Sequence, residues 1–142
     1  MIKINLEVIP RTKKNSQQIV YAKGRYIVIP SKAYQQFERE CLKQIKAIYR
    51  QKIDKPINIK ATFYMPTRRK VDLTNLLEAV DDMLVKAEVI KDDNRDIVAG
   101  HDGSRVHYDK ENPHIEIKIT KIDNYEQWRE KWKVSKSIMN YM

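Results

Sequence analysis

The chain contains very little cysteine, glycine or proline. Its 142 residues include one cysteine, three glycines and five prolines. The lone cysteine, Cys41, cannot form a disulfide within the chain and fits a reducing compartment. It falls on an apolar helical face, which indicates a buried and inert thiol. The few glycines form no Gly-rich phosphate loop, and the sequence shows no internal repeat or low-complexity segment.

Long hydrophobic runs are also missing. No apolar stretch approaches the roughly 18 residues that a membrane span needs, and the first residues do not read as a signal peptide. We therefore expect a cytoplasmic protein with no membrane partner. A chain of 142 residues can bury a core without disulfides, so one main domain is expected.

Acidic residues are scarce relative to basic ones. The chain has 28 Lys and Arg against 19 Asp and Glu, which leaves a formal net charge of +9. Such an excess favours a polyanionic partner, and nucleic acid is the most direct candidate. An anionic membrane is less favoured because no basic amphipathic segment dominates the start of the chain. The alternative is a basic domain whose charge serves only solubility.

Alternating apolar and polar residues predict strands over 2–9, 57–65 and 115–119. A hairpin is predicted over 20–29, with Gly24 supplying the positive φ that its turn needs. Ser31 is predicted to cap a helix over about 32–50. Residues 97–108 predict short strands around the Gly100–Gly103 break. The residues that the first helix is expected to bury are Tyr34, Phe37, Cys41, Ile45 and Ile48.

A second helix is predicted after Asp72, within the segment 68–96. Its apolar stripe has helical spacing and comprises Leu73, Leu76, Leu77, Val80, Met83, Leu84 and Ala87. The opposite arc carries Asn75, Glu78, Asp81 and Asp82. We expect the loop beyond Lys86 to bring Asp92 and Asp93 back beside Asp72.

Clustered acids on a basic chain indicate metal-dependent phosphodiester chemistry. Carboxylates repel a phosphodiester unless a divalent cation lies between them, and Mg²⁺ prefers hard oxygen ligands. The same acids have simpler explanations: Asp72 could only cap the helix, which is worth about 1 kcal/mol, and Asp92 and Asp93 could belong to a solvated turn. A calcium-binding loop is excluded because its glycine position is Ile97 and its glutamate position is Gly103. His101 and His107 are expected to be structural or surface residues, because no second His or Cys lies at ligand spacing.

Four elements of this segment fall at matching intervals: the basic run Arg68-Arg69, Asp72-Leu73-Thr74-Asn75, Asp82-Met83-Leu84, and Asp92-Asp93. In this pattern the chain resembles the RusA family of Holliday-junction resolvases, many of them phage-borne. The resemblance covers about residues 1–121 and leaves 122–142 as a separate C-terminal extension. Two positions depart from the family pattern, because Thr74 replaces a metal-binding aspartate and Glu78 replaces a lysine. Glu78 could restore the missing negative charge one helical turn further along.

The resemblance implies a Mg²⁺-dependent, structure-selective endodeoxyribonuclease, with Mn²⁺ able to substitute. It would resolve four-way DNA junctions in recombination and repair by paired symmetric nicks that leave 5′-phosphate and 3′-hydroxyl ends. Family members are homodimers, and two-fold symmetry suits symmetric nicking. Asp72 and Asp93 would be catalytic, and Asp72, Asp92 and Asp93 would bind the metal, with Asp82 and Glu78 as further members of the cluster. The DNA-binding residues would be Lys13, Lys14, Arg68, Arg69 and Lys70.

Two rival functions remain open. The departures at Thr74 and Glu78 are also compatible with a junction-binding protein that has lost catalysis. An interaction protein is a further possibility, because Tyr125, Trp128 and Trp132 share one side of a possible helix within 122–142. The expected fold is α/β or α+β: a mixed sheet of about five or six strands, two main helices on one side, and the C-terminal helix.

Overall fold

The computed structural model describes residues 1–13 and 17–122, with only the backbone described at residues 17 and 18. Lys14 and the helix expected beyond residue 122 lie outside the described residues. None of the helices in the described part of the chain is long and apolar enough to cross a membrane.

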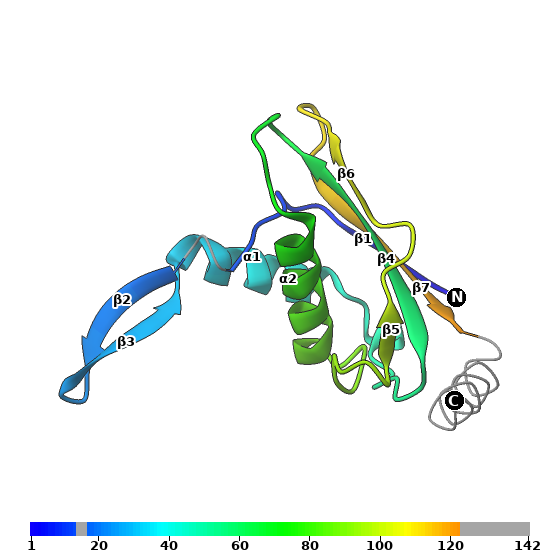
Figure 1. Cartoon of the computed structure of the whole chain (residues 1–142), viewed down its shortest axis with the longest axis horizontal. Coiled ribbons are helices and arrows are strands. Elements are labelled where there is room, and N and C mark those ends of the chain that lie inside the picture. The colour runs from blue at the N-terminus through cyan, green and yellow to red at the C-terminus, as the bar shows by residue number, and fades with distance from the viewer. Residues whose placement is uncertain (14–16, 123–142) are drawn as a thin grey trace, which may run out of the picture.

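The body of the protein is built on a mixed sheet of five strands (Figure 1). Strand β7 (His114–Lys121) lies between β1 (Ile2–Leu6) and β4 (Ile57–Met65), and it is antiparallel to both. Two short strands, β5 (Val98–Gly100) and β6 (Arg105–Tyr108), pair in parallel with successive parts of β4. This architecture confirms the predicted α+β class.

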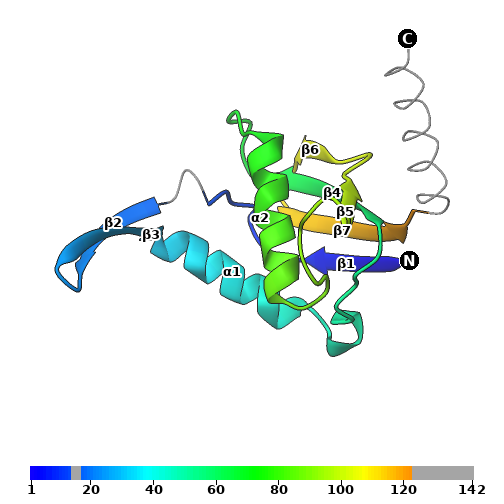
Figure 2. The same cartoon turned by 60° about the horizontal axis from the view of Figure 1, so that its bottom comes forward.

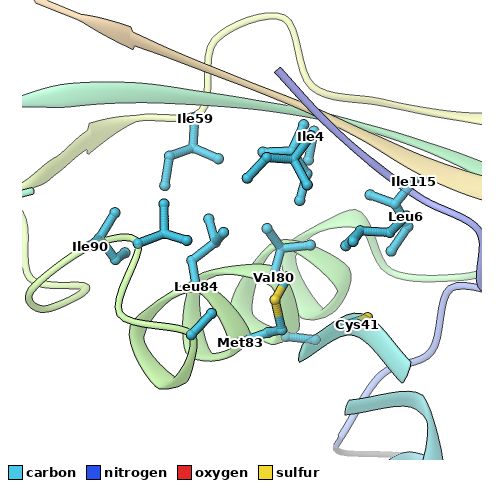
Figure 3. Packing of buried hydrophobic residues seen from close by; sticks show 14 of the residues in the cluster. Ile4, Leu6, Cys41, Ile59, Val80, Met83, Leu84, Ile90 and Ile115 are labelled. Atoms are coloured by element: carbon cyan, nitrogen blue, oxygen red, sulfur yellow. The ribbon is translucent and has the colours of Figure 1, made fainter. Parts of the chain in front are cut away.

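Helices α1 (Lys32–Gln44) and α2 (Leu73–Lys86) lie on one side of this sheet, as Figures 1 and 2 show together. The core fills the space between them and the inner face of the strands (Figure 3). Val80, Met83 and Leu84 of α2 lie toward Ile4 and Ile59 of the sheet, and all five side chains are buried. The alternation predicted for β4 is observed, because Ile57, Ile59, Ala61 and Phe63 are at most 1% exposed.

Strands β2 (Gln17–Ala22) and β3 (Arg25–Pro30) form a separate two-stranded hairpin. It projects away from the body of the molecule (Figure 1). Both turn residues have positive φ, 51° at Lys23 and 78° at Gly24, which suits the twist of a two-residue hairpin turn. The predicted hairpin and the role of Gly24 are therefore confirmed.

The first helix is shorter than predicted. Ser31 caps it by accepting a hydrogen bond from the Tyr34 amide at 3.1 Å, as expected, but the helix ends at Gln44 rather than near residue 50. Ile45 is extended, and a short 3₁₀ turn η1 (Ala47–Tyr49) follows. Arg50 donates hydrogen bonds to the Leu42 and Ile45 carbonyls, which satisfies the helix end. Ile48 is consequently 72% exposed, so its predicted burial is wrong.

The first strand is also shorter than its pattern. β1 ends at Leu6, where the Val8 amide donates to the Leu6 carbonyl and turns the chain away from the sheet. The predicted extent to residue 9 is therefore wrong, and Ile9 is 45% exposed. The break expected at Gly100–Gly103 is observed between β5 and β6.

Candidate active site

Asp72 begins helix α2 as its N-cap. Its Oδ1 accepts a hydrogen bond from the Thr74 amide at 2.9 Å, and its own backbone is extended. One of the otherwise unpaired amides at the helix start is satisfied in this way. The capping role proposed for Asp72 is thus real, and the side chain remains exposed to solvent.

Asp92 organises the loop that follows α2. It accepts hydrogen bonds from the Asp93 amide at 2.8 Å and from the Asn94 side chain at 3.1 Å. These two donors lower the pKa of the exposed Asp92 carboxyl. Asn94 in turn accepts from the Asp96 amide at 3.0 Å. The loop is therefore a tight turn held by its own hydrogen bonds, and these fix the position of Asp93.

Asp93 points into a small pocket of about 90 Å³ on the helix side of the sheet. Partial desolvation, together with the nearby Asp92, raises the pKa of the Asp93 carboxyl. The polar residues that line the pocket with it are Lys13, Tyr34, Asn75, Glu78 and Asp82. Three carboxyl groups from two segments, α2 and the loop after it, are thus gathered beside one cation.

Asp82 occupies the most constrained position in this pocket. Its Oδ2 is inaccessible to solvent and accepts no hydrogen bond, although Lys86 Nζ lies 3.6 Å away and Lys13 Nζ 4.0 Å away. The hydroxyl of Tyr34 is also buried without a hydrogen-bond partner. Burial, and next the charge of Asp82, raise the pKa of Tyr34. A buried carboxylate oxygen without a donor is costly, and a cation ligand is one way to satisfy it.

Lys86 ties the second helix to the first. Its ammonium group lies 2.8 Å from Glu38 Oε2 on α1, and this hydrogen bond raises the pKa of Lys86. The same ammonium group reaches Asp82 on its own helix, so the wall of the pocket is held by a charge network between α1 and α2. Sequence reasoning did not identify this network, because Glu38 and Lys86 are far apart in the chain.

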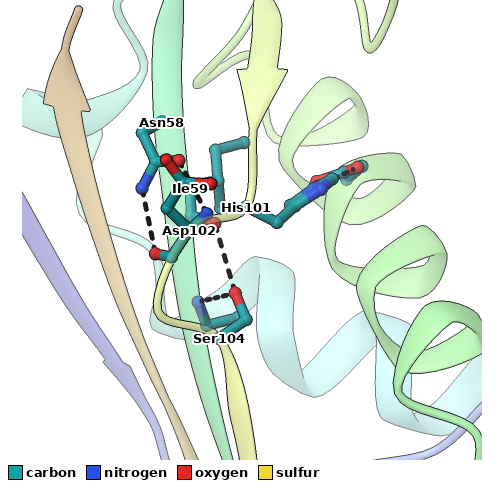
Figure 4. Close-up of polar contacts among 7 residues, drawn as sticks. Asn58, Ile59, His101, Asp102 and Ser104 are labelled. Atoms are coloured by element: carbon teal, nitrogen blue, oxygen red, sulfur yellow. Dashed lines mark hydrogen bonds and ion pairs between the residues drawn. The ribbon is translucent and has the colours of Figure 1, made fainter.

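Asp81 is the main correction within the helix. The sequence placed it on the polar arc, but it is only 7% exposed and both of its oxygens contact His101 Nε2, at 2.8 and 3.0 Å. His101 extends from the loop after β5 toward α2 (Figure 4). The sequence did contain a signal for this burial, because Asp81 lies four residues after Leu77 and three before Leu84, which places it on the apolar side of the helix. The pair fixes α2 to the sheet, and the expectation that His101 is structural agrees with it.

The loop that carries His101 is held by the neighbouring strand. Asn58 on β4 accepts from the Asp102 amide at 2.8 Å and donates to the Asp102 carbonyl at 3.2 Å (Figure 4). Ser104 accepts from the Ala61 amide at 3.1 Å. These bonds give the Asp81–His101 pair a rigid base.

The cations proposed to bind DNA lie in two places. Lys13 lines the acidic pocket, whereas Arg68, Arg69 and Lys70 are exposed in the loop between β4 and α2. The Arg68 guanidinium stacks over the Tyr108 ring at 4.2 Å, which orients it. Lys14 lies outside the described residues.

Of the three acids first proposed as metal ligands, only Asp93 lines the pocket; Asp72 and Asp92 do not. Within residues 1–13 and 17–122, no group of three or more His, Cys, Asp or Glu side chains is already arranged around a single ion position. The chemistry of the pocket nevertheless fits a hard divalent cation. Glu78, Asp82 and Asp93 supply carboxylate oxygens and Asn75 an amide, and one of these oxygens is buried without a donor.

Comparison with known proteins places the chain in a family. Residues 7–120 match the family model described as Endodeoxyribonuclease RusA. A curated relative from Aquifex aeolicus (strain VF5), named Crossover junction endodeoxyribonuclease RusA, is 38% identical over 66 residues. That match covers 46% of this chain and 52% of the relative, so the chain spans about half the length of the curated relative it matches. On the extent of the family match, the chain belongs to the RusA endodeoxyribonuclease family.

Proposed function

We propose that this protein is a metal-dependent, structure-selective endodeoxyribonuclease that resolves four-way DNA junctions. The observation that carries the proposal is the pocket in which Asp93 joins Glu78 and Asp82, on a chain with a net charge of +9. Acids gathered on a basic protein suit a phosphodiester substrate only when a cation mediates between them. Family membership supports the same reaction.

The metal proposed is Mg²⁺, with Mn²⁺ able to substitute, held principally by Asp93 with Asp72 and Asp92 as the other ligands predicted from the sequence. The pocket favours adding Glu78 and Asp82 to this set. Bound Mg²⁺ would polarise the scissile phosphate and acidify a water molecule. The presence of Glu78 in the pocket also supports its proposed compensation for Thr74.

The chain's own groups have separate roles around that centre. Lys13 and Lys86 place positive charge beside Asp82, because both ammonium groups lie within 4.0 Å of its Oδ2. The Asp92 turn holds Asp93 in the pocket. Arg68, Arg69 and Lys70 contact backbone phosphates, which provides affinity and orientation without sequence information.

The proposal includes a homodimer, which the projecting hairpin supports. Ile19, Tyr21, Tyr26 and Val28 share one face of it and are 59–78% exposed. An isolated two-stranded hairpin is marginally stable in water, so an apolar face of this kind favours burial against a second copy. Replacing Tyr26 and Val28 by serine should lower the mass measured by light scattering. Ile48→Ser, at an exposed apolar site outside the hairpin, is the control.

The decisive experiment is cleavage of a labelled four-way junction in Mg²⁺, beside a linear duplex. Paired symmetric nicks in the junction alone are expected. Asp93→Asn should reduce cleavage by at least about 100-fold, since even groups that only support a metal ligand affect activity by 10–100-fold. The matched control is Asp96→Asn, which removes an exposed acid of the same loop that does not line the pocket.

Tight junction binding without cleavage in either metal would sink the nuclease proposal and favour the binding protein. Thr74→Asp would then identify the cause if it restored cutting. Glu78→Gln tests the compensation directly, because unchanged metal-dependent cleavage in that variant would show that Glu78 plays no part.

A further inference from the structure

The outer face of the five-stranded sheet is polar and carries an unusual concentration of cations. Both helices lie against the inner face (Figures 1 and 2), and within residues 1–13 and 17–122 no element covers the outer one. The alternation that buries Ile4, Ile117 and Ile59 turns Lys3, Lys118 and Lys60 outward.

These three lysines lie in one row across three adjacent strands. Lys3 on β1 is directly opposite Lys118 on β7, and Lys118 is directly opposite Lys60 on β4. Neighbouring strands are about 4.8 Å apart, and like charges directly opposite each other destabilise a sheet. The row therefore stores repulsion that an anion would relieve.

No acid within the described part of the chain forms an ion pair with the row. Among the described residues, none of the three lysines has a carboxylate within 4.0 Å, whereas Lys13 and Lys86 each do. Glu116 lies on the same face, but its carboxylate contacts His114 Nε2 at 3.1 Å. The next row holds both Glu116 and Arg105, on either side of Thr62, so the net positive charge of the face rests on the three lysines.

The row borders a shallow hollow of about 340 Å³ rather than a flat surface. Its lining includes all three lysines together with Asn5, Thr62 and Glu116. The Lys60 side chain lies over Gly103, where a Cβ would come within 3.2 Å of Lys60 Cδ. Gly103 also has a φ of 85°, which favours glycine. The loop thus leaves room for the Lys60 stem along the sheet.

We propose that this face binds the sugar-phosphate backbone of a DNA arm through Lys3, Lys60 and Lys118. The proposal rests on the proposed function and adds a second contact surface, across the sheet from the acidic pocket. Three lysines without an ion-pair partner in residues 1–13 and 17–122 complement a polyanion, whereas two copies of the face would repel each other. A four-way junction has several arms, so one protein can engage one arm at the pocket and another on this face.

The test measures junction binding by the full chain in EDTA, so that cutting does not interfere, as a function of salt concentration. The triple variant Lys3→Gln, Lys60→Gln and Lys118→Gln should reduce the slope of log affinity against log salt by about 2 to 3, because each phosphate contact contributes about 0.9. A triple arginine variant at the same positions should keep the slope. The matched control neutralises Lys32, Lys46 and Lys55, which are exposed and lie outside the sheet.

An unchanged slope in the glutamine variant, or an equal loss in the control, overturns the proposal. A change in the mass of the DNA-free protein would instead identify the face as a protein interface, which also overturns it. Failure of the proposed function is distinguishable, because the wild-type protein would then neither prefer nor cut the junction. The midpoint temperature of thermal unfolding should be at least as high for the glutamine variant as for the wild type, since the substitution removes repulsion.

Discussion

The two faces of the five-stranded sheet differ in almost every property, although the same strands supply both. Ile117 is 2% exposed among the core residues, whereas the next residue, Lys118, faces solvent between two other lysines. The helices pack on the inner face, and the acidic pocket lies on this side of the sheet, lined by both helices. The outer face holds cations without acidic partners in the described part of the chain.

This separation shows how one small domain can carry opposite charges without mutual neutralisation. Were Lys3, Lys60 and Lys118 beside Glu78, Asp82 and Asp93, they would form ion pairs and neutralise each other. The sheet and its buried core keep the two groups on opposite sides. Lys13 and Lys86 are the exceptions, since they lie at the pocket and pair with its acids.

The largest stability effect is expected on the inner face. Ile117→Ala should lower the free energy of unfolding by about 2 to 5 kcal/mol, because it leaves a cavity between the sheet and α2. Urea denaturation followed by circular dichroism measures this. A loss below about 1 kcal/mol would mean that the inner face is not a tightly packed core.

A smaller loss is expected where the inner face is polar. Asp81→Ala leaves His101 without its partner and should cost about 1 to 3 kcal/mol. The control is a double-mutant cycle with His101→Ala, in which a coupling energy of about 0.5 kcal/mol or more is expected. Additive effects of the two single changes would refute the pairing.

A substitution on the outer face should change the free energy of unfolding in the opposite direction. Lys118→Thr removes the middle charge of the lysine row and should raise the free energy of unfolding by about 0.2 to 1 kcal/mol. High salt should shrink this gain, because it screens exposed charges. If Lys118→Thr destabilised the protein as Ile117→Ala does, the contrast between the faces would be lost.

The smallest effect concerns pH. Burial lowers the pKa of His114, but hydrogen bonding to the Asn112 carbonyl and Glu116 outweighs it and leaves that pKa above its usual value. Protonated His114 therefore contributes stability that is fully present below about pH 6.5, its unfolded value, and is lost as pH rises through the folded pKa. The free energy of unfolding, measured by urea denaturation at a series of pH values, should show this loss. The loss should be smaller in Glu116→Gln. A pH dependence that Glu116→Gln leaves unchanged would rule out this pair as its source.

Local signals in the sequence were reliable where the structure depends on neighbouring residues. Alternation predicted β4 and β7, Gly24 predicted the hairpin turn, and Ser31 and Asp72 predicted two helix starts. Such features involve residues within a few positions of each other, so a linear pattern contains them. The end of α1 was missed because the Arg50 side chain reaches back to its carbonyls.

The sequence by itself determined the order of most strands and helices, the excess of positive charge and the segment that supplies the acids of the pocket, although it did not set the ends of β1 and α1. Only the tertiary structure decided which side chains meet. Asp82 rather than Asp72 lies beside Asp93 in the pocket, Asp81 is buried against His101, and three separated lysines share one row. Strand register and helix docking set these contacts, because each brings together residues that are far apart in the chain.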